Sequence, residues 1–494
     1  MFQPDIADIL TQTNPTTTKT VEGKGLRTLL LNLPYPTRII RRYMCSYNAP
    51  NFLFPPLELI SLGAILKEWE KDEVALYDAI AKGADLKETN EYIAQYQPDI
   101  IIAITGFEIF EHDMNMVRGI KEHNPNSKIV LFGHYATQFT QEVMERVPVD
   151  IIIQGEPDLI FAEAYKKIKA GESLEGVKGI AYRTKDGKIV LQQGNLRLPD
   201  PSVLPMPAYN MLEKDAYFEP FLPKPFGMIQ TARGCPYQCN YCVKSFGTKL
   251  TTRTPEQIVD EIKELKRLFG IKSLRFIDDT FTVIPSRVIA ICKLMIDEKV
   301  EVQWSCLSRA DTLNEEMLIW MKKAGCKRVY IGVESGSQRI LDFYKKKVNV
   351  EEALANIKLC KKVGVETMGF FIVGMPEETR EDFDQTLKFA IKSDLTFAIV
   401  FELIPYPGTP LFPLMKDKIN FSLMPYVNEY KDPELRERFH KWEKEFYYKF
   451  YFRPRYIARS MARAISKPTE TITSALKLLK FIVLPQHSNR KDFI

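Results

Sequence analysis

Short apolar runs alternate with segments of helical periodicity through the N-terminal part of this chain. The run Leu26–Leu33 is apolar at most positions, and Leu57–Lys71 then carries apolar residues at helical spacing. Further apolar runs follow at Val74–Tyr77, Ile100–Thr105, Lys128–Phe132 and Asp150–Gln154. Strands and helices that alternate in this way predict a parallel sheet covered on both faces. We therefore expect a flavodoxin-like or Rossmann-like α/β domain over residues 25–198, with its ligand at the carboxyl ends of the strands.

A second series of strands and helices begins after a proline-rich stretch. Leu198–Pro207 holds four prolines, which cannot continue a helix or a central strand, so residues 199–225 are predicted to form a semi-rigid linker. The strands expected beyond it are Met228–Thr231, Leu274–Ile277, Val302–Cys306, Arg328–Val333, Thr367–Val373 and Phe397–Ile404. Six such units with right-handed crossovers predict a partial (β/α)6 TIM-like barrel over residues 226–412. Residues 413–494 are expected to form a helical C-terminal region, and residues 1–24 a flexible leader.

The first strand of the second series leads into a cysteine-rich loop. Three of the eight cysteines, Cys235, Cys239 and Cys242, fall within eight residues in a Cys-x3-Cys-x2-Cys pattern. Thiolates suit zinc or an iron–sulfur cluster. A closed zinc site normally has four ligands, and the sequence has neither a second CxxC pair nor a histidine near this loop. The pattern therefore favours a cluster of four irons with one iron left open, and a zinc knuckle or three ordinary thiols are the structural alternatives.

This cysteine spacing resembles the signature of the radical S-adenosylmethionine (SAM) superfamily. The resemblance implies a [4Fe–4S] cluster bound by Cys235, Cys239 and Cys242, with SAM chelated by the fourth iron. It also implies that Tyr241, the aromatic residue before the last cysteine, lies near the adenine of SAM. The six-unit partial barrel is the fold that the resemblance implies as well.

Polar residues follow the second and third expected barrel strands, where the fold directs them to the mouth of the barrel. Asp278 and Asp279 are paired acids that could accept hydrogen bonds from an ammonium, and the family uses this region for the amino group of SAM. A solvated turn or helix cap is the structural alternative. Ser308 and Arg309 follow the third strand, where a cation could meet the carboxylate of SAM.

The fourth and fifth strands carry further elements similar to the family. Glu334 lies in a Gly-x-Glu-Ser-Gly element and could bond the ribose hydroxyls, or it could receive Arg328 or Arg339 in a salt bridge. Ile372 and Gly374 lie in a segment that resembles the fifth-strand motif near the adenine, where backbone groups would contact the base.

The strand ends of the N-terminal domain look like the corresponding loops of the cobalamin-binding domain that precedes many radical SAM barrels. These loops contain Gly106, Gly133, Gly155 and Glu156. A glycine after a buried strand also simply makes a turn, which is the structural alternative. The Asp-x-His-x-x-Gly motif that supplies a lower axial histidine is missing, and His134 is predicted to be a loop histidine bonded to the backbone. The resemblance thus implies cobalamin bound without a histidine ligand, or a pocket that has lost it.

Composition narrows the expected cellular compartment and the expected classes of binding partner. The chain has 494 residues, a formal net charge of +5 and 27% charged residues, which favours a soluble globular protein and gives no case for nucleic acid. No secretory leader or run of about 18 apolar residues is present, and the remaining cysteines are scattered, so a reduced cytoplasm is expected. The basic stretch Phe452–Lys480 is amphipathic, and either contacts a membrane surface peripherally or packs its apolar side on the barrel.

The function expected from these features is radical SAM chemistry, with C-methylation of an unactivated carbon if cobalamin is bound. Two alternatives stay open: a radical cyclase or oxidase of a tetrapyrrole or lipid, as in the anaerobic magnesium-protoporphyrin monomethyl ester cyclase-like branch, and a cobalamin-binding sensor that does not catalyse. The aromatic and basic tail suggests a hydrophobic small-molecule substrate. The chemistry also implies an electron donor such as flavodoxin or ferredoxin.

Overall fold

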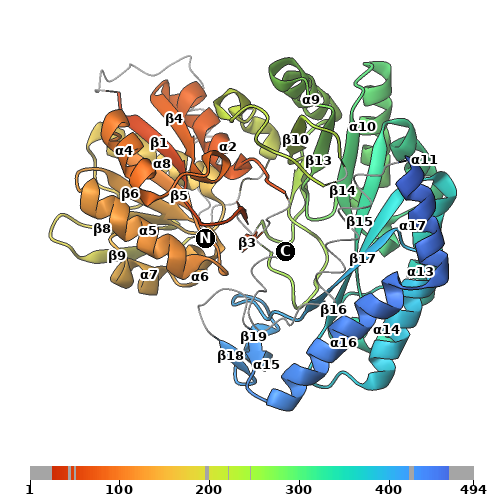
Figure 1. Ribbon diagram of the computed structural model, residues 1–494. Coiled ribbons are helices and arrows are strands. Elements are labelled where there is room, and N and C mark those ends of the chain that lie inside the picture. The colour runs from red at the N-terminus through yellow and green to blue at the C-terminus, as the bar shows by residue number, and fades with distance from the viewer. Residues whose placement is uncertain are drawn as a thin grey trace.

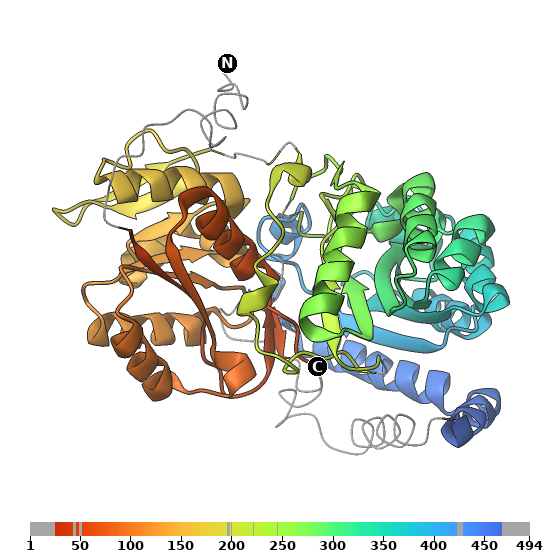
Figure 2. The same cartoon turned by 90° about the horizontal axis from the view of Figure 1, so that it is seen from above.

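Two sheets, one mainly and one wholly parallel, form the two halves of the molecule in a computed structural model of the chain, and each is flanked by helices (Figure 1). The structure describes residues 25–42, 46–48, 52–194, 198, 200–220, 222–244, 246–421 and 428–466. The predicted leader and the basic stretch beyond residue 466 lie outside the described residues. Seen from above, the two halves lie side by side, with the C-terminal helices along the second one (Figure 2).

The N-terminal sheet has the strand order β4-β1-β5-β6-β7-β8-β9. Its strands are β1 (Arg27–Asn32), β4 (Glu73–Asp78), β5 (Ile100–Ile104), β6 (Lys128–Phe132), β7 (Ile151–Ile153), β8 (Ile180–Arg183) and β9 (Ile189–Gln192). The first five are parallel in the flavodoxin order 2-1-3-4-5, and β8 and β9 extend the sheet as an antiparallel hairpin. This confirms the predicted α/β domain.

Helices cover both faces of this sheet because its strands are apolar on both sides. Leu29 and Leu31 pack into one hydrophobic cluster, and Leu30 between them packs into the cluster on the opposite face. The helical elements are α2 (Leu57–Ile65) with a π-helical end (Leu66–Glu70), α3 (Ala79–Lys82), α4 (Leu86–Tyr96), α5 (Phe110–His123), α6 (His134–Gln138), α7 (Thr140–Arg146) and α8 (Pro157–Ala170). A short hairpin, β2 (Ile39–Arg41) with β3 (Ser46–Asn48), stands apart from the sheet.

The segment between the two sheets is anchored inside the barrel. It holds two short 3-10 turns, Pro201–Val203 and Tyr209–Met211. The carboxylate of Glu219 is buried against Arg275 at 3.4 Å and accepts hydrogen bonds from Ser305 and Tyr330, which lie on three neighbouring barrel strands. These contacts satisfy the buried Glu219 carboxylate and tie the segment to the barrel strands.

The second sheet is an all-parallel six-stranded partial barrel in the order β10-β13-β14-β15-β16-β17. Its strands are β10 (Phe226–Ile229), β13 (Ser273–Phe276), β14 (Gln303–Arg309), β15 (Cys326–Glu334), β16 (Glu366–Val373) and β17 (Phe397–Glu402). The helical elements are α9 (Pro255–Phe269), α10 (Pro285–Asp297), α11 (Glu315–Lys323), α12 (Gln338–Phe343), α13 (Val350–Val363) and α14 (Arg380–Lys392), with 3-10 turns at Phe281–Val283 and Ala310–Thr312. The predicted barrel is confirmed.

Two barrel strands run further toward the mouth than the hydrophobic pattern predicts. Ser308 and Arg309 are the last residues of β14 instead of following it, because they pair with Ile331 and Gly332 of β15. Glu334 closes β15 with a positive φ of 66°, next to a shift in register against β16. That shift changes the direction of the chain where the Gly-x-Glu-Ser-Gly element begins.

The free edge of β17 is covered by the C-terminal region. Its elements are α15 (Phe412–Met415), β18 (Ile419–Phe421), β19 (Asn428–Tyr430), α16 (Pro433–Tyr451) and α17 (Pro454–Ser466). The hydroxyl groups of Tyr447 and Tyr451 on α16 exchange hydrogen bonds with the backbone of Val400 and Ala398 on β17. An exposed strand edge is thereby satisfied by two tyrosines one helical turn apart.

The part of the basic stretch that the structure describes is α17. Arg455 and Arg459 pair with Asp394 of the barrel, whereas Ile457 and Met461 are 38% and 66% exposed. No helix among the described residues is both long and apolar enough to cross a bilayer. Membrane contact through this region stays a prediction.

Candidate functional site

The cysteine loop leaves the barrel through a tight turn. A two-stranded ribbon, β11 (Ala232–Arg233) with β12 (Thr251–Thr252), frames it. Gly234 has a φ of 81°, and a Cβ there would lie 2.2 Å from the carbonyl oxygen of Lys249. Only glycine fits this conformation and this close backbone approach, so the turn that presents the cysteines depends on it.

The three predicted ligands are free thiols at the barrel mouth, and Cys239 is buried. Burial raises the pKa of Cys235 and of Cys242, which keeps both sulfurs protonated unless a metal compensates the thiolate charge. Electrostatic interaction with Cys235 and Cys239 also raises the pKa of Cys242, so the three groups share one environment.

The donor set of the loop fits a cluster better than a closed zinc site. A tetrahedral zinc site with Zn–S bonds of about 2.3 Å would hold its sulfurs about 3.8 Å apart. Although all three cysteines fall within the described residues, their sulfurs do not all lie within 4.8 Å of one another, and no described histidine or fourth cysteine joins them at that distance. Cysteine thiolates are the usual ligands of such clusters, so three thiols without a described fourth ligand fit three irons of one cubane.

Two barrel side chains contact the thiols directly. Arg309 donates from Nη1 to Sγ of Cys239 at 3.5 Å, and Thr280 Oγ1 lies 3.8 Å from Sγ of Cys235. The Arg309 guanidinium also binds Asp311 at 3.0 Å and lies 3.6 Å from the ring centre of Tyr237. The structure thus places Arg309 beside the sulfurs, where its N–H donors can tune a bound cluster.

The paired acids after β13 have different roles in the structure. Asp278 accepts hydrogen bonds from the backbone N–H of Thr231 at 2.6 Å and of Ala232 at 3.0 Å, and from the Thr231 hydroxyl. Both its oxygens are therefore committed to the base of the cysteine loop. Asp279 receives no side-chain hydrogen bond from the described residues, and its charge is felt at Cys235 and Cys242. Burial and the neighbouring Asp278 charge raise the pKa of Asp279 to about 6.

A buried lysine, which the sequence analysis did not single out, joins Glu334 and Tyr241. Lys346 is 3% exposed, and its ammonium lies 2.9 Å from Glu334 Oε1 and 3.3 Å from the Tyr241 hydroxyl. The alternative partners of Glu334 bind elsewhere, Arg328 to Glu366 and Arg339 to Asp382. Lys346 stands in a run of three lysines, and nothing in that run distinguishes the buried one.

The fifth-strand motif is held by a buried carboxyl group. Gly374 has a φ of 112°, and its N–H donates to Glu378 Oε2 at 2.8 Å, as does Met375 N–H at 3.3 Å. The N–H of Gly374 is therefore already bonded, whereas the side chain of Ile372 points from β16 into the barrel, half-buried. Glu378 Oε1 accepts no hydrogen bond within the described residues, and burial raises the pKa of this group to about 7.

Replacing Glu378 by glutamine tests this buried acid through the pH dependence of stability. The folded protein binds the Glu378 proton more tightly than the unfolded chain, so the wild type loses stability as the pH rises through about 7. E378Q, which keeps the acceptor for Gly374 N–H, should be more stable than wild type by about 3 kcal/mol at about pH 8. The advantage should vanish below about pH 4 in anaerobic denaturant titrations, where Glu378 is protonated in both states. Glu377→Gln, an exposed neighbour paired with Lys418, is the matched control and should show no such gain.

The predicted loops of the N-terminal domain lie at the carboxyl edge of its sheet. Gly106 follows β5 and is buried. A Cβ at Gly133 would lie 2.1 Å from the carbonyl oxygen of Thr105, and the N–H of Gly155 is bonded to the Thr137 hydroxyl. Internal packing accounts for Gly133 and Gly155, as the structural alternative proposed.

The histidine and the last barrel turn close this edge toward the barrel. His134 Nε2 lies 3.2 Å from the carbonyl oxygen of Pro407, and burial lowers the pKa of His134 to about 4. The predicted backbone-bonded role of His134 agrees with this contact. Beside it, Tyr406 donates to Glu108 at 2.5 Å. The loop after β17 thus lies directly on the strand ends of the N-terminal sheet.

Glu156 is engaged within the protein. Its carboxylate forms an ion pair with Arg233, the residue two positions before Cys235, and accepts the N–H of Leu198 at 3.0 Å. Burial and the neighbouring Asp158 charge raise the pKa of Glu156, and the Arg233 charge opposes this.

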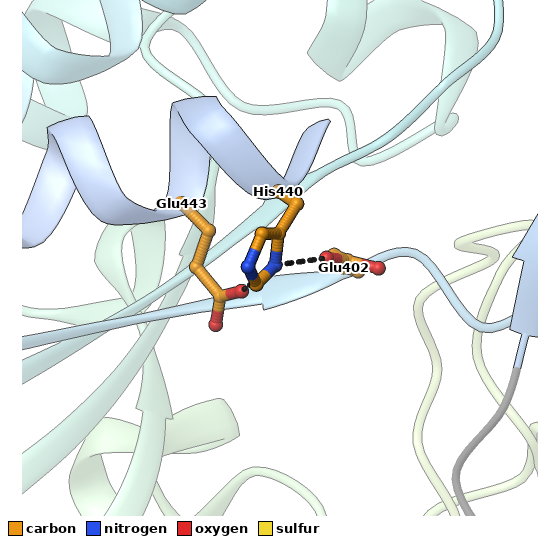
Figure 3. A group of neighbouring side chains, drawn as sticks. All are labelled: Glu402, His440 and Glu443. Atoms are coloured by element: carbon orange, nitrogen blue, oxygen red, sulfur yellow. Dashed lines mark ion pairs between the residues drawn. The ribbon is translucent and has the colours of Figure 1, made fainter. Parts of the chain in front are cut away.

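A separate group of ionisable side chains lies where α16 meets the end of β17. His440 stands between Glu402 and Glu443, with Nδ1 3.8 Å from an oxygen of each (Figure 3). The contact with Glu402 joins α16 to the end of β17, whereas Glu443 lies on α16 itself, three residues after His440.

The fold, the open-sided thiol triad and the strand-end residues together define a class of protein. Residues 229–390 match the sequence profile of the Radical SAM superfamily. The chain is 31% identical to an uncharacterized methyltransferase of Pyrococcus horikoshii, over 88% of this chain and 94% of that relative. The chain therefore belongs to the radical SAM superfamily, as the cysteine pattern predicts, and it is an enzyme of that class.

Particular relatives and solved structures narrow the comparison. The chain is 28% identical to the anaerobic magnesium-protoporphyrin IX monomethyl ester cyclase of Rubrivivax gelatinosus, over 78% of this chain and 71% of the relative. Its fold is similar to that of the cobalamin-dependent radical enzyme OxsB, with a TM-score of 0.71, 17% identity and coverage of 96% and 77% of the two chains. The methyltransferase TsrM from Kitasatospora setae is similar with a TM-score of 0.66, 19% identity and coverage of 80% and 75%.

Proposed function

We propose that this protein is a cobalamin-dependent radical SAM methyltransferase that modifies an unactivated carbon of a small molecule. The observation that carries the proposal is the triad Cys235, Cys239 and Cys242, held in one loop at the mouth of a partial barrel and without a fourth described ligand. When bound, the [4Fe–4S] cluster, SAM and cobalamin supply the electron, the 5′-deoxyadenosyl radical and the methyl group for this reaction.

The side chains around the triad are suited to hold SAM. Asp279 offers a carboxylate for the amino group, because Asp278 is committed to the loop. Lys346 offers a buried ammonium near Tyr241, where a carboxylate or ribose oxygen can be bound alongside Glu334. Ser308 and Arg309 border the same space, and Arg309 also contacts Cys239. In this arrangement the chain orients SAM and keeps water away from the reacting atoms.

Cobalamin would lie between the carboxyl edge of the N-terminal sheet and the barrel. Gly133 and Gly155 form turns there, and His134 is turned to Pro407, so the lower face would lack a histidine ligand. The support comes from the relative named as a methyltransferase and from the similar structures, which contain cobalamin in OxsB and cobalamin with a [4Fe–4S] cluster in TsrM.

The inner wall of the barrel favours an apolar substrate. Along β16 and β17, alternate side chains face the helices and are buried, and the others face the interior and are half-buried. Tyr330, Phe370 and Phe401 form a row across neighbouring strands, with ring centres 5.9 and 5.8 Å apart, and Phe401 is 37% exposed. Tyr330 is buried at one end of this row and Phe401 is exposed at the other, so the Phe401 end is suited to contact a planar or hydrophobic compound. The electron donor would be a small redox protein such as flavodoxin or ferredoxin, and the setting a reducing cytoplasm.

Anaerobic reconstitution tests the proposal. The purified chain, given iron, sulfide, hydroxocobalamin, dithionite and SAM, should show cluster and corrinoid absorbance together and should release 5′-deoxyadenosine. Zinc without iron or sulfide would replace the proposal with a structural knuckle. Cluster and corrinoid without 5′-deoxyadenosine would indicate a sensor. A product formed without transfer of labelled methyl from SAM would favour the cyclase or oxidase alternative, which the similarity to the cyclase of Rubrivivax gelatinosus suggests.

Lys346→Met tests the assigned cation. Loss of one charge-assisted contact should weaken SAM binding to the reconstituted protein by about 10- to 100-fold, measured by equilibrium dialysis. The exposed neighbour Lys345→Met is the matched control and should bind SAM as wild type does. Equal affinities in both variants would remove Lys346 from the SAM site.

A further inference from the structure

A buried ion-pair group joins the N-terminal domain to the cysteine loop. The guanidinium of Arg233 binds Asp158 at 2.6 and 3.3 Å and forms a second ion pair with Glu156. The side chains are 11%, 2% and 5% exposed, so water competes little for these contacts. Arg233 Nε donates to Gln230 at 3.2 Å, which fixes the plane of the fork. We call Arg233 with Glu156 and Asp158 the Arg233 bridge.

The bridge lies close to the first thiol along a stiff piece of backbone. Arg233 ends β11, Gly234 makes the turn that only glycine can make, and Cys235 follows. The N–H of Cys235 is bonded to the carbonyl oxygen of Gly247 at 3.1 Å, so the residue cannot move independently of the loop. We therefore expect that a displacement of the Arg233 guanidinium would displace the sulfur of Cys235.

The far side of the same loop is fixed to the same domain. Phe246, four residues after Cys242, is 6% exposed and packs in the hydrophobic cluster on one face of the N-terminal sheet. The Arg233 guanidinium lies 5.0 Å from the Phe246 ring centre. The N-terminal domain thus holds the cysteine loop at both ends, by charge at Arg233 and by packing at Phe246.

In the N-terminal domain, the Arg233 bridge ends in the loop between β7 and α8. Glu156 follows Gly155, which has a φ of 72°, and Asp158 lies in the first turn of α8. This is the carboxyl edge at which the N-terminal domain is proposed to bind its ligand. The bridge therefore connects the two cofactor regions through three side chains.

We propose that Arg233 is a positioning residue for the cluster: through Glu156 and Asp158, the N-terminal domain sets the geometry of the loop that carries Cys235. The proposal rests on the proposed cluster at the triad but goes beyond it, because it makes the first domain part of the cluster site. It does not require that cobalamin is bound.

The test uses the full chain and three variants. Arg233→Met removes the fork and the charge, and Arg233→Lys keeps the charge but loses the bidentate geometry. The triple variant R233M/E156Q/D158N removes every charge of the bridge, and its E156Q change keeps a side-chain oxygen that can accept the N–H of Leu198. After anaerobic reconstitution, the readouts are iron and sulfide per chain, the electron paramagnetic resonance (EPR) spectrum of the reduced cluster, and its change on adding SAM.

All three variants should show an altered EPR spectrum with a weakened response to SAM, and SAM cleavage about 10- to 100-fold slower, as for the loss of groups that support metal ligands. Far-ultraviolet circular dichroism and thermal unfolding should show that the neutral triple variant is folded. The exposed Arg267→Met, which loses a pair with Glu264, is the matched control and should match wild type in every readout.

Two outcomes would overturn the proposal. In one, R233M and R233K give wild-type EPR spectra and SAM responses. In the other, the neutral triple variant regains wild-type behaviour while R233M does not. The defect of R233M would then come from the unpaired, buried carboxylates of Glu156 and Asp158 and not from the loss of a positioning contact. If the wild type itself holds zinc and no sulfide, the proposed function fails first, and metal analysis of the wild type alone identifies that case.

Discussion

Cys239→Ala is expected to abolish reductive SAM cleavage, with more than about 100-fold loss, because outer-shell changes alone already cost that much at metal sites. Cys239 is the buried member of the triad and the one that receives the Arg309 guanidinium at 3.5 Å. Without its sulfur, one iron of the proposed cluster would have no protein ligand, and Arg309 would lose the contact with Sγ of Cys239. The measurement is 5′-deoxyadenosine formed from SAM after anaerobic reconstitution, with iron and sulfide counted per chain.

The matched control is Cys360→Ala, which removes an equally buried thiol on α13, outside the mouth of the barrel. Cys360→Ala removes the same atoms from a packed core as Cys239→Ala does. We therefore expect a small loss of stability with cluster content unchanged. If C239A retained the cluster and the cleavage activity, or if C360A lost both, the assignment of the triad would be wrong.

Asp278→Ala should destabilise the folded chain by roughly 2 to 6 kcal/mol and should lower cluster content with it. The change leaves the backbone N–H groups of Thr231 and Ala232 buried without an acceptor, and each such donor costs about 1–3 kcal/mol. Those two groups lie at the base of the cysteine loop, so the loop should lose its position before the barrel unfolds. Denaturant midpoints and iron content of the same preparations measure the two effects.

Asp279→Ala, at the adjacent position, should behave differently. Its carboxylate receives no hydrogen bond from described side chains or backbone N–H groups, and burial with the Asp278 charge raises the pKa of Asp279 to about 6. Its removal should leave stability unchanged or slightly improved while SAM affinity falls. Equal loss of stability in D278A and D279A would contradict the division between a loop anchor and a ligand-binding acid.

The elements of this fold could be predicted because their signals are local. The apolar runs of β5 and β6 are buried on both faces, and their composition shows it without tertiary information. The helix α9 begins at Pro255 after a Thr254 cap that also forms a capping box, as Thr and Pro at these positions indicate. The observed ends of strands differ from the predicted ones where pairing with a neighbouring strand extends them, as at Ser308 and Arg309.

The thiol triad could be predicted for the same reason, since Cys235, Cys239 and Cys242 are neighbours in the chain and their spacing is itself the signal. Lys346 could not, because its neighbours Lys345 and Lys347 are lysines that remain exposed. The turn after α12 buries the middle ammonium against Glu334, and the sequence contains no trace of that turn.

The class of enzyme, the two parallel sheets and the three sulfurs were thus readable from residues close together in the chain. The tertiary structure alone decided which of two adjacent aspartates faces the thiols, and that Glu156 meets Arg233 across 77 positions of sequence. The physical reason is that periodicity and ligand spacing are properties of short segments, whereas the partner of a buried charge is chosen by packing between segments that the chain order keeps apart.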